Sequence, residues 1–532
     1  MSRRGKMPKP LGWHGVGLPA CLVLLAGLAG LPSAVAAISS AVPAQTTARS
    51  SAAQAATPAR PRRTAPEVVP AGARESSAHE ADRLRAGFLT RGLCSALWVN
   101  HRDRDDFLAH DILLAAEGLA RTDLEVDATA RRVTGHLAGG GSVTAAFHPT
   151  HGCTLLPPGM DDVAFDTTPV RPARPVARDR RWPAGDGPRS PPPAGVDPAA
   201  LEAAVRAFFV EDAARPIHTR AVVAVHDGAL IAERYAPGFD RHSVMIGWSM
   251  GKSLTAALVG VAVRKGWLSL DEPAPLAEWQ REGDPRARIR IRDLMQMSSG
   301  LDFKRLALDD PAFFSAANHH FQGYLAPVDV FALATGRPVE FAPQQVGRYR
   351  NGDPLSLGRI LREAVEKHGM NYLAFPQREL FDPIGATSMV LERDYQGNMI
   401  LTGLDHGTPR DWARFGLLHA QDGIWNGRRL LPAGWVRFVS SPAPAWPESN
   451  YGGLFWLNRS GALPGAPRDA YYAAGAFGQF VIIVPSEHLV VVRMGYSAES
   501  KATRQSVGAG LVRLIAVLHP TPPRSGPDGE VE

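Results

Sequence analysis

The sequence predicts a fold of the α/β (α+β) class, with an antiparallel sheet flanked by helices and a small N-terminal α+β module. Two apolar runs that favour strands, 221–226 and 229–235, are joined by Asp227-Gly228, a dipeptide typical of tight hairpins. A second pair of such runs lies at 480–485 and 489–494. Between the pairs, apolar residues recur at helical spacing from Leu254 to Trp267. Because hairpin strands run antiparallel, the sheet is expected to be antiparallel.

The first 36 residues are expected to be a signal peptide. Basic residues precede an apolar run at 18–31, and Ala34-Val35-Ala36 supplies the small residues of a cleavage site. A membrane anchor is the alternative, but the run is too short to span a bilayer comfortably. Cys21 lies near the start of the run, so a lipid attachment there is not expected. We therefore expect a periplasmic or secreted protein, cleaved near Ala36, with no stable membrane anchor.

Composition separates three further segments from the folded parts of the chain. Residues 37–78 are rich in small residues, Pro and Arg and are expected to be a disordered spacer, and 521–532 a disordered tail. Residues 169–197 form a Pro/Arg-rich linker, whose arginines are expected to be solvated. Signal cleavage removes four basic residues and no acidic ones, so the formal net charge falls from +6 to +2. Nucleic acid is therefore not an expected partner.

Residues 79–168 are expected to form the small N-terminal module. A helical pattern at 105–119 is followed by strand-like runs at 124–126, 132–137 and 143–147. After signal cleavage the chain keeps two cysteines, Cys94 and Cys153, in a compartment that permits disulfides. A bridge between them would close a loop of about 60 residues, worth roughly 4 kcal/mol in the chain-entropy description. Two free thiols in the core are the alternative.

Ser249 and Lys252 lie three residues apart at the predicted start of the apolar helix, so their side chains share one helix face. A serine hydroxyl needs a neighbouring base to become a nucleophile, and a desolvated lysine can serve as that base. The N-terminus of a helix also presents backbone N–H groups to a developing oxyanion. Ser-x-x-Lys arises often by chance, however, so further motifs are needed to support it.

The same serine lies in residues 247–251 (GWSMG), which match the nucleophile elbow of α/β-hydrolases. An elbow requires a buried parallel strand before the serine and an acid and a histidine after it. The upstream hairpin predicts antiparallel strands instead. The candidate histidines, His488 and His519, lie in a predicted turn and in the Pro-rich C-terminal end, where we expect surface residues.

Further motifs follow in order along the chain, at 294–301 (LMQMSSGL), 349–351 (YRN), 403–416 (GLDHGTPRDWARFG), 426–432 (NGRRLLP) and 473–479 (AAGAFGQ). With them, residues 198–520 resemble the serine β-lactamase-like hydrolases. The resemblance is to the branch holding class C β-lactamases, D-Ala-D-Ala carboxypeptidases, family VIII carboxylesterases and 6-aminohexanoate-dimer hydrolases, most of all the last. It implies a β-lactamase/transpeptidase-like antiparallel sheet flanked by helices, plus an all-helical subdomain.

The resemblance implies roles for Ser249 and Lys252 of the Ser-x-x-Lys motif and for Tyr349 and Asn351 of the motif at 349–351. Ser249 becomes the acylated nucleophile, Lys252 the amine that shares its proton, and Tyr349 a second proton-transfer partner. A phenol beside an ammonium is expected to be drawn towards phenolate, and the pair should titrate together. Asn351 becomes a polar positioning residue near Lys252. The alternative for Asn351 is a turn-forming residue before Gly352.

The resemblance also implies an oxyanion hole made by the backbone N–H groups of Ser249 and Ala476. Gly475 would let the substrate approach the edge strand closely. Ala473 departs from the family pattern, because relatives usually carry Lys or His there to hold a substrate carboxylate. A methyl group cannot pair with a carboxylate, which disfavours penicillins and D-Ala-D-Ala termini and favours esters or non-peptide amides.

We therefore expect an exported serine hydrolase that cleaves a small-molecule ester or amide through an acyl-enzyme on Ser249. No metal or organic cofactor is implied, and His319-His320 is expected in an exposed loop instead of a metal site. The loop at 302–323 is expected to shape the pocket. Two alternatives stay open: a D-Ala-D-Ala carboxypeptidase or β-lactamase, and a pseudoenzyme whose cleft only binds a peptide or wall fragment.

Overall fold

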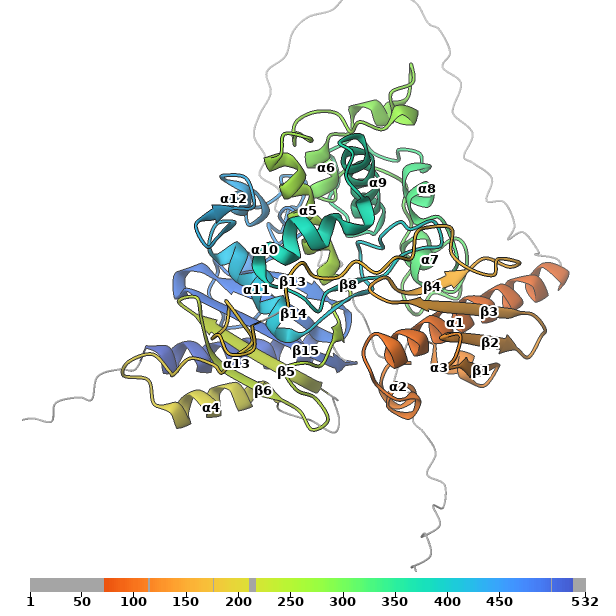
Figure 1. Cartoon of the computed structure of the whole chain (residues 1–532). Helices are drawn as coiled ribbons and strands as arrows, with labels where there is room; N and C mark the ends of the chain where they lie inside the picture. The colour runs from red at the N-terminus through yellow and green to blue at the C-terminus, as the bar shows by residue number, and fades with distance from the viewer. Residues whose placement is uncertain (1–70, 113–114, 176, 210–216, 499, 520–532) are drawn as a thin grey trace, which may run out of the picture.

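The computed structural model describes residues 71–112, 115–175, 177–209, 217–498 and 500–519. They form an N-terminal module that lies beside a larger main domain (Figure 1). The predicted signal peptide, the predicted spacer up to residue 70 and the predicted tail lie outside the described residues. None of the helices in the described part of the chain is long and apolar enough to cross a membrane.

The main domain is built on a six-stranded sheet in the order β12-β13-β14-β15-β5-β6, with antiparallel neighbours throughout. Both predicted hairpins are present, and the last strand of the second pairs with the first strand of the first. Segments far apart in the sequence thus meet at the centre of the sheet, which confirms the predicted fold. The strands are β5 (Ile217–His226), β6 (Ala229–Tyr235), β12 (Trp456–Leu457), β13 (Tyr471–Gly475), β14 (Gln479–Val484) and β15 (Leu489–Ser497).

Helices cover both faces of this sheet. Val223 and Val225 of β5 belong to one core, which α5 (Met250–Arg264) and α11 (Pro409–Ala420) share, whereas Val222 and Ala224 belong to a second core. The second core is closed by α4 (Pro198–Arg206) and α13 (Ser500–Leu518). Because successive strand side chains point to opposite faces, a strand buried on both sides reads as a continuous apolar run. Helix α5 ends before Gly266, whose φ is +74°, as its sequence predicts.

A helical region stands above the sheet in Figure 1, around the buried α5. Its helices are α6 (Ile291–Met295), α7 (His319–Leu325), α8 (Val330–Thr335) and α9 (Gly352–Lys367). A small three-stranded sheet joins β7 (Met245–Ile246), β9 (Asp405–Gly407) and β8 (Val390–Leu391), with antiparallel neighbours. Shorter elements complete the domain: α10 (Asp382–Ile384), α12 (Trp435–Val439), β10 (Ile424–Trp425) and β11 (Arg428–Arg429).

The N-terminal module is one long helix packed across a four-stranded antiparallel meander. The helix is α1 (Ala71–Trp98), and the strands are β1 (Thr122–Asp127), β2 (Arg132–Leu137), β3 (Ser142–His148) and β4 (Gly152–Leu156). The sequence did not predict α1, which begins inside the segment assigned to the spacer. The single helical pattern expected at 105–119 is two short helices, α2 (Arg104–His110) and α3 (Ala116–Leu119). Asp103 caps α2 by accepting a hydrogen bond from the Asp106 N–H.

Two features fasten α1. Cys94 of α1 and Cys153 of β4 form the expected disulfide, with their Cα atoms 6.1 Å apart and both residues buried. On the side facing the main domain, the buried carboxylate of Glu392 accepts hydrogen bonds from Arg91 Nε at 3.0 Å and Ser95 Oγ at 2.6 Å. Removing one partner of such a buried charge pair is strongly destabilising, so the module is firmly joined to the main domain.

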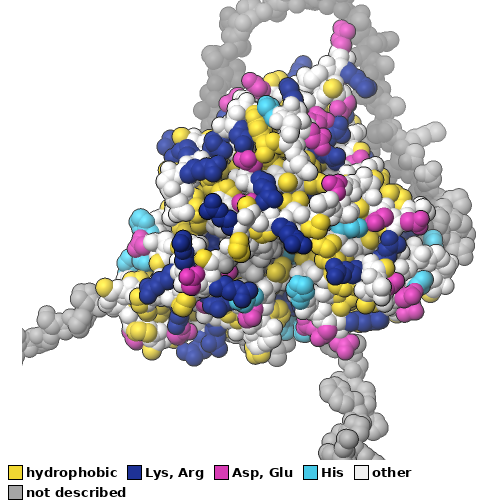
Figure 2. Space-filling view, viewed as in Figure 1, with side chains coloured by type: hydrophobic (Ala, Val, Ile, Leu, Met, Phe, Trp, Pro, Cys, Tyr) yellow, Lys and Arg dark blue, Asp and Glu magenta, His cyan; other side chains and the backbone are white. Residues whose placement is uncertain are grey.

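The linker at 169–197 is packed more closely than its composition suggested. Its arginines are exposed as expected, and on the face seen in Figure 2 basic side chains are dispersed among acidic, apolar and uncharged ones. However, Trp182 is buried, and its indole N–H donates to the carbonyl of Arg410 in α11. Arg414 of the same helix donates to the carbonyls of Pro183 and Gly185. The expectation of a fully solvated linker was therefore wrong for its central part.

Candidate active site

Ser249 occupies the position just before α5 without a capping side-chain hydrogen bond, and Lys252 follows one turn later on the same face. The Lys252 Nζ atom donates hydrogen bonds to Ser249 Oγ and to the Thr402 carbonyl, both at 2.8 Å. Lys252 is only 1% exposed, and burial lowers its pKa well below the ordinary lysine value, since an ammonium loses its hydration there. A neutral amine in contact with a serine hydroxyl can accept its proton.

Tyr349 lies against this pair, just before α9. The Lys252 Nζ atom is 4.8 Å from the centroid of the Tyr349 ring, and the ring packs against Trp456 at 5.1 Å. Burial raises the pKa of Tyr349 to about 12, although a hydrogen bond with Ser249 acts in the opposite direction. The phenol is therefore neutral near pH 7, in contrast to the phenolate that the sequence suggested. Desolvation explains the difference, because burial penalises the charged phenolate itself and also disfavours the ammonium of Lys252 that would have stabilised it.

Asn351 is linked to Lys252 through two intermediate residues. Its Nδ2 atom donates to the Tyr324 hydroxyl at 3.0 Å, and that hydroxyl donates to Thr402 Oγ1 at 2.9 Å. The carbonyl of Thr402 is the second acceptor for Lys252 Nζ. Asn351 also precedes α9, but its side chain does not cap that helix. The arrangement fits a positioning residue that acts through Tyr324 and Thr402.

The two residues expected to form the oxyanion hole lie where the end of β13 meets the segment before Ser249. A Cβ atom placed on Gly475 would lie 2.1 Å from the Gly247 carbonyl oxygen and 3.0 Å from Trp248 Cβ. The absence of a side chain at Gly475 thus allows close contact between two parts of the chain, and its expected role in the approach of substrate stays a prediction. This contact brings the segment that leads into Ala476 against the segment that leads into Ser249. Within the described residues, neither backbone N–H of this pair donates to another group.

The residues beside the two N–H groups are held in an uncommon backbone conformation. Trp248 has a φ of +49° and Phe477 a φ of +60°, and their rings lie 5.7 Å apart. Non-glycine residues in the left-handed region store strain and concentrate at functional sites. Phe88 of α1 stacks on the other side of Trp248, with ring centroids 6.2 Å apart. The N-terminal module therefore supports the segment that leads into Ser249.

The two glycines of the GWSMG motif accommodate a buried carboxyl group. A Cβ atom at Gly247 would lie 2.4 Å from Asp405 Oδ2, and one at Gly251 would lie 2.1 Å from Asp405 Oδ1. Burial raises the pKa of Asp405 well above the ordinary value, and the positive charge of Lys252 opposes that rise. The strand before Ser249, β7, pairs antiparallel with β9, which begins at Asp405.

The α/β-hydrolase interpretation of that motif was therefore wrong. It needs a parallel strand before the serine, whereas the neighbours of β7 and of the main sheet are antiparallel. Its candidate histidines are surface residues, as the sequence predicted. The side chain of His488 is 76% exposed in a turn, and His519 pairs with Glu487 at the surface.

Two other expectations change at this site. His319 and His320 are buried in α7 and do not lie in an exposed loop; His320 Nδ1 accepts a hydrogen bond from the Asn351 N–H. The methyl group of Ala473 is fully buried in the core between the sheet and α5. A lysine at position 473 would therefore have to bury its ammonium. Among the described residues, no group of three or more His, Cys, Asp or Glu side chains could hold a metal ion.

The sequence did not single out Asp405, Tyr324, Thr402 or Trp248, although all four lie at the site. The signal for Asp405 was the glycine pair around Ser249, which looked like an elbow but leaves space for a side chain distant in sequence. Tyr324 and Thr402 carry no local pattern, because their role depends on contacts between α7, α9 and the segment after β8.

Comparison with known proteins places this site in a family context. The family model described as Beta-lactamase matches residues 204–508. The 6-aminohexanoate-dimer hydrolase of Paenarthrobacter ureafaciens is 24% identical over 303 residues, which cover 52% of this chain and 72% of that protein.

Among solved structures, a putative 6-aminohexanoate-dimer hydrolase from Bacillus anthracis is similar with a TM-score of 0.44 and 22% identity, over 53% of this chain and 74% of that one. A putative β-lactamase from Bacteroides dorei is similar with a TM-score of 0.47 and 18% identity, over 59% and 98% of the two chains.

Proposed function

Because the chain belongs to the β-lactamase family, we propose that it is a serine hydrolase that cleaves ester or non-peptide amide bonds through an acyl-enzyme on Ser249. The observation that carries this proposal is the 2.8 Å hydrogen bond between Lys252 Nζ and Ser249 Oγ, made by a lysine whose pKa is lowered by burial. A nucleophile in contact with a neutral amine is the pairing that acyl transfer requires.

We assign one group to each step of the proposed reaction. Neutral Lys252 accepts the proton of Ser249 as its Oγ attacks the substrate carbonyl carbon. The backbone N–H groups of Ser249 and Ala476 stabilise the resulting oxyanion. Tyr349 gives its proton to the leaving alcohol or amine as the bond to the carbonyl carbon breaks, and it regains a proton from Lys252. Attack by water, with its proton passing back through the same groups, releases the acid and restores Ser249.

The preference for esters and non-peptide amides over cell-wall-type amides is supported by Ala473. Its buried methyl group offers no cation to a substrate carboxylate on that side of the site. The similarity to a 6-aminohexanoate-dimer hydrolase supports a non-peptide amide as one possible bond type. A D-Ala-D-Ala carboxypeptidase or β-lactamase activity is less well supported for the same reason.

A substrate panel tests the proposal. Purified protein is assayed with p-nitrophenyl esters of increasing acyl length, linear amides and nitrocefin, with Ser249→Ala as the matched control. We expect rapid turnover of short-chain esters, poor turnover of nitrocefin and none by the variant. Efficient nitrocefin hydrolysis with slow ester turnover would favour the carboxypeptidase or β-lactamase alternative. A folded protein without any turnover would favour the pseudoenzyme.

We also propose that the protein is exported, with cleavage near Ala36. The apolar run at 18–31 with its preceding basic residues supports export, and a disulfide in the N-terminal module suits an oxidising compartment. Fractionation of cells that express the full chain, followed by N-terminal sequencing of the mature protein, tests this. An intact N-terminus in the cytoplasmic fraction would contradict it.

A further inference from the structure

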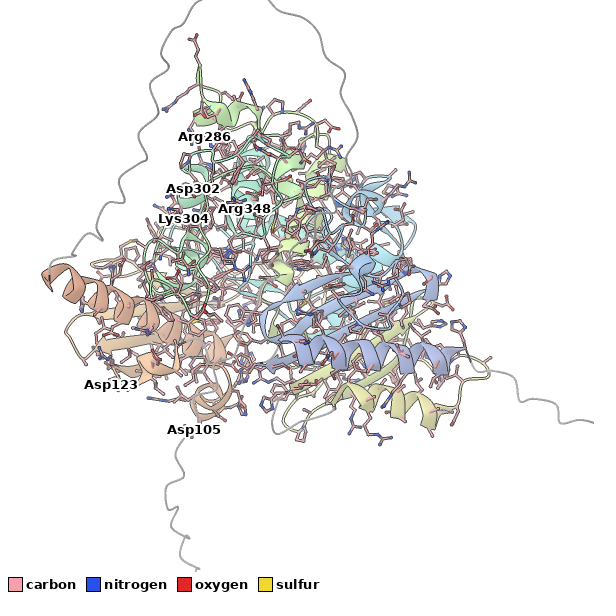
Figure 3. All side chains as sticks on the ribbon, turned by 180° about the vertical axis from the view of Figure 1, so that it is seen from behind. Asp105, Asp123, Arg286, Asp302, Lys304 and Arg348 are labelled. Carbon is pink, nitrogen blue, oxygen red and sulfur yellow. A yellow bond between two sulfur atoms is a disulfide. The ribbon has the colours of Figure 1, made fainter. Side chains whose placement is uncertain are left out.

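Helix α1 of the N-terminal module lies against the helical region of the main domain. Figure 3 shows α1 between that region, where Lys304 is labelled, and the rest of the module, where Asp105 and Asp123 are labelled. The approach to α7 is close, because a Cβ atom on Gly87 would lie 2.0 Å from the carbonyl oxygen of Leu325. One face of α1 therefore packs directly on an element that carries a residue of the candidate site.

The same face of α1 holds the backbone on both sides of Tyr324. On one side, Gly87 lies against the carbonyl of Leu325. On the other side, Arg91 donates from Nη1 to the carbonyl of Gly323 at 3.2 Å. Tyr324 lies between these two carbonyls, and its hydroxyl is hydrogen-bonded within the site. The place of Tyr324 relative to α1 is therefore set by contacts that do not involve its own ring.

Phe88 continues this face of α1 towards the nucleophile. Its ring stacks on the ring of Trp248, with centroids 6.2 Å apart and planes 13° apart, and both side chains are buried. Tyr324 contacts the same indole at 6.1 Å, and Phe477 contacts it at 5.7 Å. The Trp248 ring is thus held by three aromatic rings, of which that of Phe88 comes from the N-terminal module.

The backbone of Trp248 links this ring contact to the proposed chemistry. Trp248 has a φ of +49°, an uncommon value for a residue with a side chain, which persists only where the surroundings hold it. The peptide unit that follows is planar and carries the N–H of Ser249, one of the two proposed oxyanion donors. If Trp248 loses a packing partner, its backbone can relax, and this would turn the Ser249 N–H away from the oxyanion.

We propose that Phe88 is a positioning residue of the active site, which acts through Trp248 to aim the N–H of Ser249 at the oxyanion. The N-terminal module is then part of the catalytic unit. This inference rests on the proposed function, because it takes Ser249 as the nucleophile and its N–H as a donor. Donors that are already in place stabilise the transition state without reorganisation, and packing by neighbouring side chains keeps them in place.

The test compares Phe88→Ala and Phe88→Leu with a matched variant on the other side of α1. Leu93→Ala is that control, because Leu93 is fully buried and lies about 140° around the helix from Phe88, away from Trp248. In all three variants the disulfide at Cys94 and the hydrogen bonds of Arg91 remain to hold α1 in place.

The measurements separate the number of active sites from the rate at each site. Sites in each full-length variant are counted by labelling with a fluorophosphonate to completion. Pre-steady-state release of p-nitrophenol from p-nitrophenyl acetate then gives the acylation rate constant and the dissociation constant of the substrate. Inhibition by phenylboronic acid reports on the oxyanion hole, since boron forms a tetrahedral adduct with the Ser249 hydroxyl that mimics the transition state. Partial unfolding lowers the number of sites, whereas a misplaced donor lowers the rate constant per site.

We expect Phe88→Ala to lower the acylation rate constant per site roughly tenfold, less than the hundred- to thousandfold loss caused by removal of a whole donor. Phenylboronic acid should inhibit this variant more weakly by a similar factor. The substrate dissociation constant should stay unchanged, because the donor acts on the transition state. Phe88→Leu should show a smaller loss, and Leu93→Ala should be less stable but keep the wild-type rate constant per site.

An unchanged rate constant in Phe88→Ala, a loss only in the number of sites, or an equal loss per site in Leu93→Ala would overturn the proposal. If the wild type forms no acyl-enzyme, hydrogen exchange measured by mass spectrometry gives the answer. The N–H groups of residues 250–252 donate to the carbonyls of residues 247–249, so their exchange reports on the turn around Trp248. Faster exchange in Phe88→Leu than in the wild type and Leu93→Ala would support the positioning role without any turnover. Equal exchange in all three would refute it.

Discussion

The carboxyl group of Asp405 occupies the space that a side chain at Gly251 would need. A Cβ atom on Gly251 would lie 2.1 Å from Asp405 Oδ1, far inside van der Waals contact, and both residues are buried. Gly251 stands between Ser249 and Lys252 on that turn. The conformation of the segment from Ser249 to Lys252 therefore depends on a residue more than a hundred positions later in the chain.

This relationship predicts that Gly251→Ala is destabilising and that Asp405→Ala relieves the effect. Overpacking of this kind costs about 1–3 kcal/mol of unfolding free energy, more than the roughly 1 kcal/mol that alanine gains over glycine in a helix. Urea denaturation of the wild type, both single variants and the double variant would measure the coupling. Gly139→Ala is the control, because its nearest neighbour would be 3.4 Å away. Strictly additive effects of the two substitutions would contradict the account.

Lys252→Ala and Tyr349→Phe should each lower the rate of acylation by orders of magnitude. The two residues act on one proton, so the double variant should be little slower than the worse single variant. Pre-steady-state release of p-nitrophenol from an activated ester measures acylation directly. Near-wild-type acylation in either single variant would remove that residue from the proposed mechanism.

The pH profile should show a base that works well below the ordinary pKa of lysine. Lys252 must be unprotonated to accept the proton of Ser249, and burial together with the charge of Arg305 lowers its pKa, while Asp405 opposes this. The value of kcat/KM for a neutral ester should therefore rise with pH and level off well below pH 10.5. Loss of the Tyr349 proton should lower it again only as pH approaches about 12. A profile that still rises beyond pH 10.5 would contradict a desolvated lysine base.

The disulfide of the N-terminal module should be present in the mature protein. Mass spectrometry of a non-reduced digest should yield the peptide pair joined through Cys94 and Cys153. Replacing both cysteines by Ala should lower the unfolding free energy of the module by about 2–5 kcal/mol. Two thiols that are freely alkylated under denaturing, non-reducing conditions would show that the bridge does not form.

The features predicted correctly from the sequence depend on local patterns. The hairpin around Asp227-Gly228 follows from turn chemistry, and the helix that begins after Ser249 follows from apolar spacing. The placement of Lys252 beside Ser249 needs only the geometry of one helical turn. The assignment of Tyr349 to the site had another basis. It came from the resemblance to a family, because no local pattern in the sequence indicates it.

What the sequence did not predict depends on contacts between distant segments or on desolvation. Helix α1 begins in a run of small and polar residues that resembles a disordered spacer, and its packing against β2, β3 and β4 is not visible locally. The burial of Trp182 against α11 reverses the expectation from a Pro/Arg-rich composition. The protonation states of Lys252 and Tyr349 follow from the depth of their burial, which no spacing encodes.

The most direct test of the central claim is to trap the acyl group on the protein. The wild type is mixed with p-nitrophenyl acetate, quenched in acid within the first turnovers and digested, and the peptides are analysed by mass spectrometry. We predict one acetyl group on the peptide that contains Ser249, located on that residue by fragmentation, and none in Ser249→Ala. An acetyl group on another residue, or hydrolysis and labelling that persist in Ser249→Ala, would contradict the account.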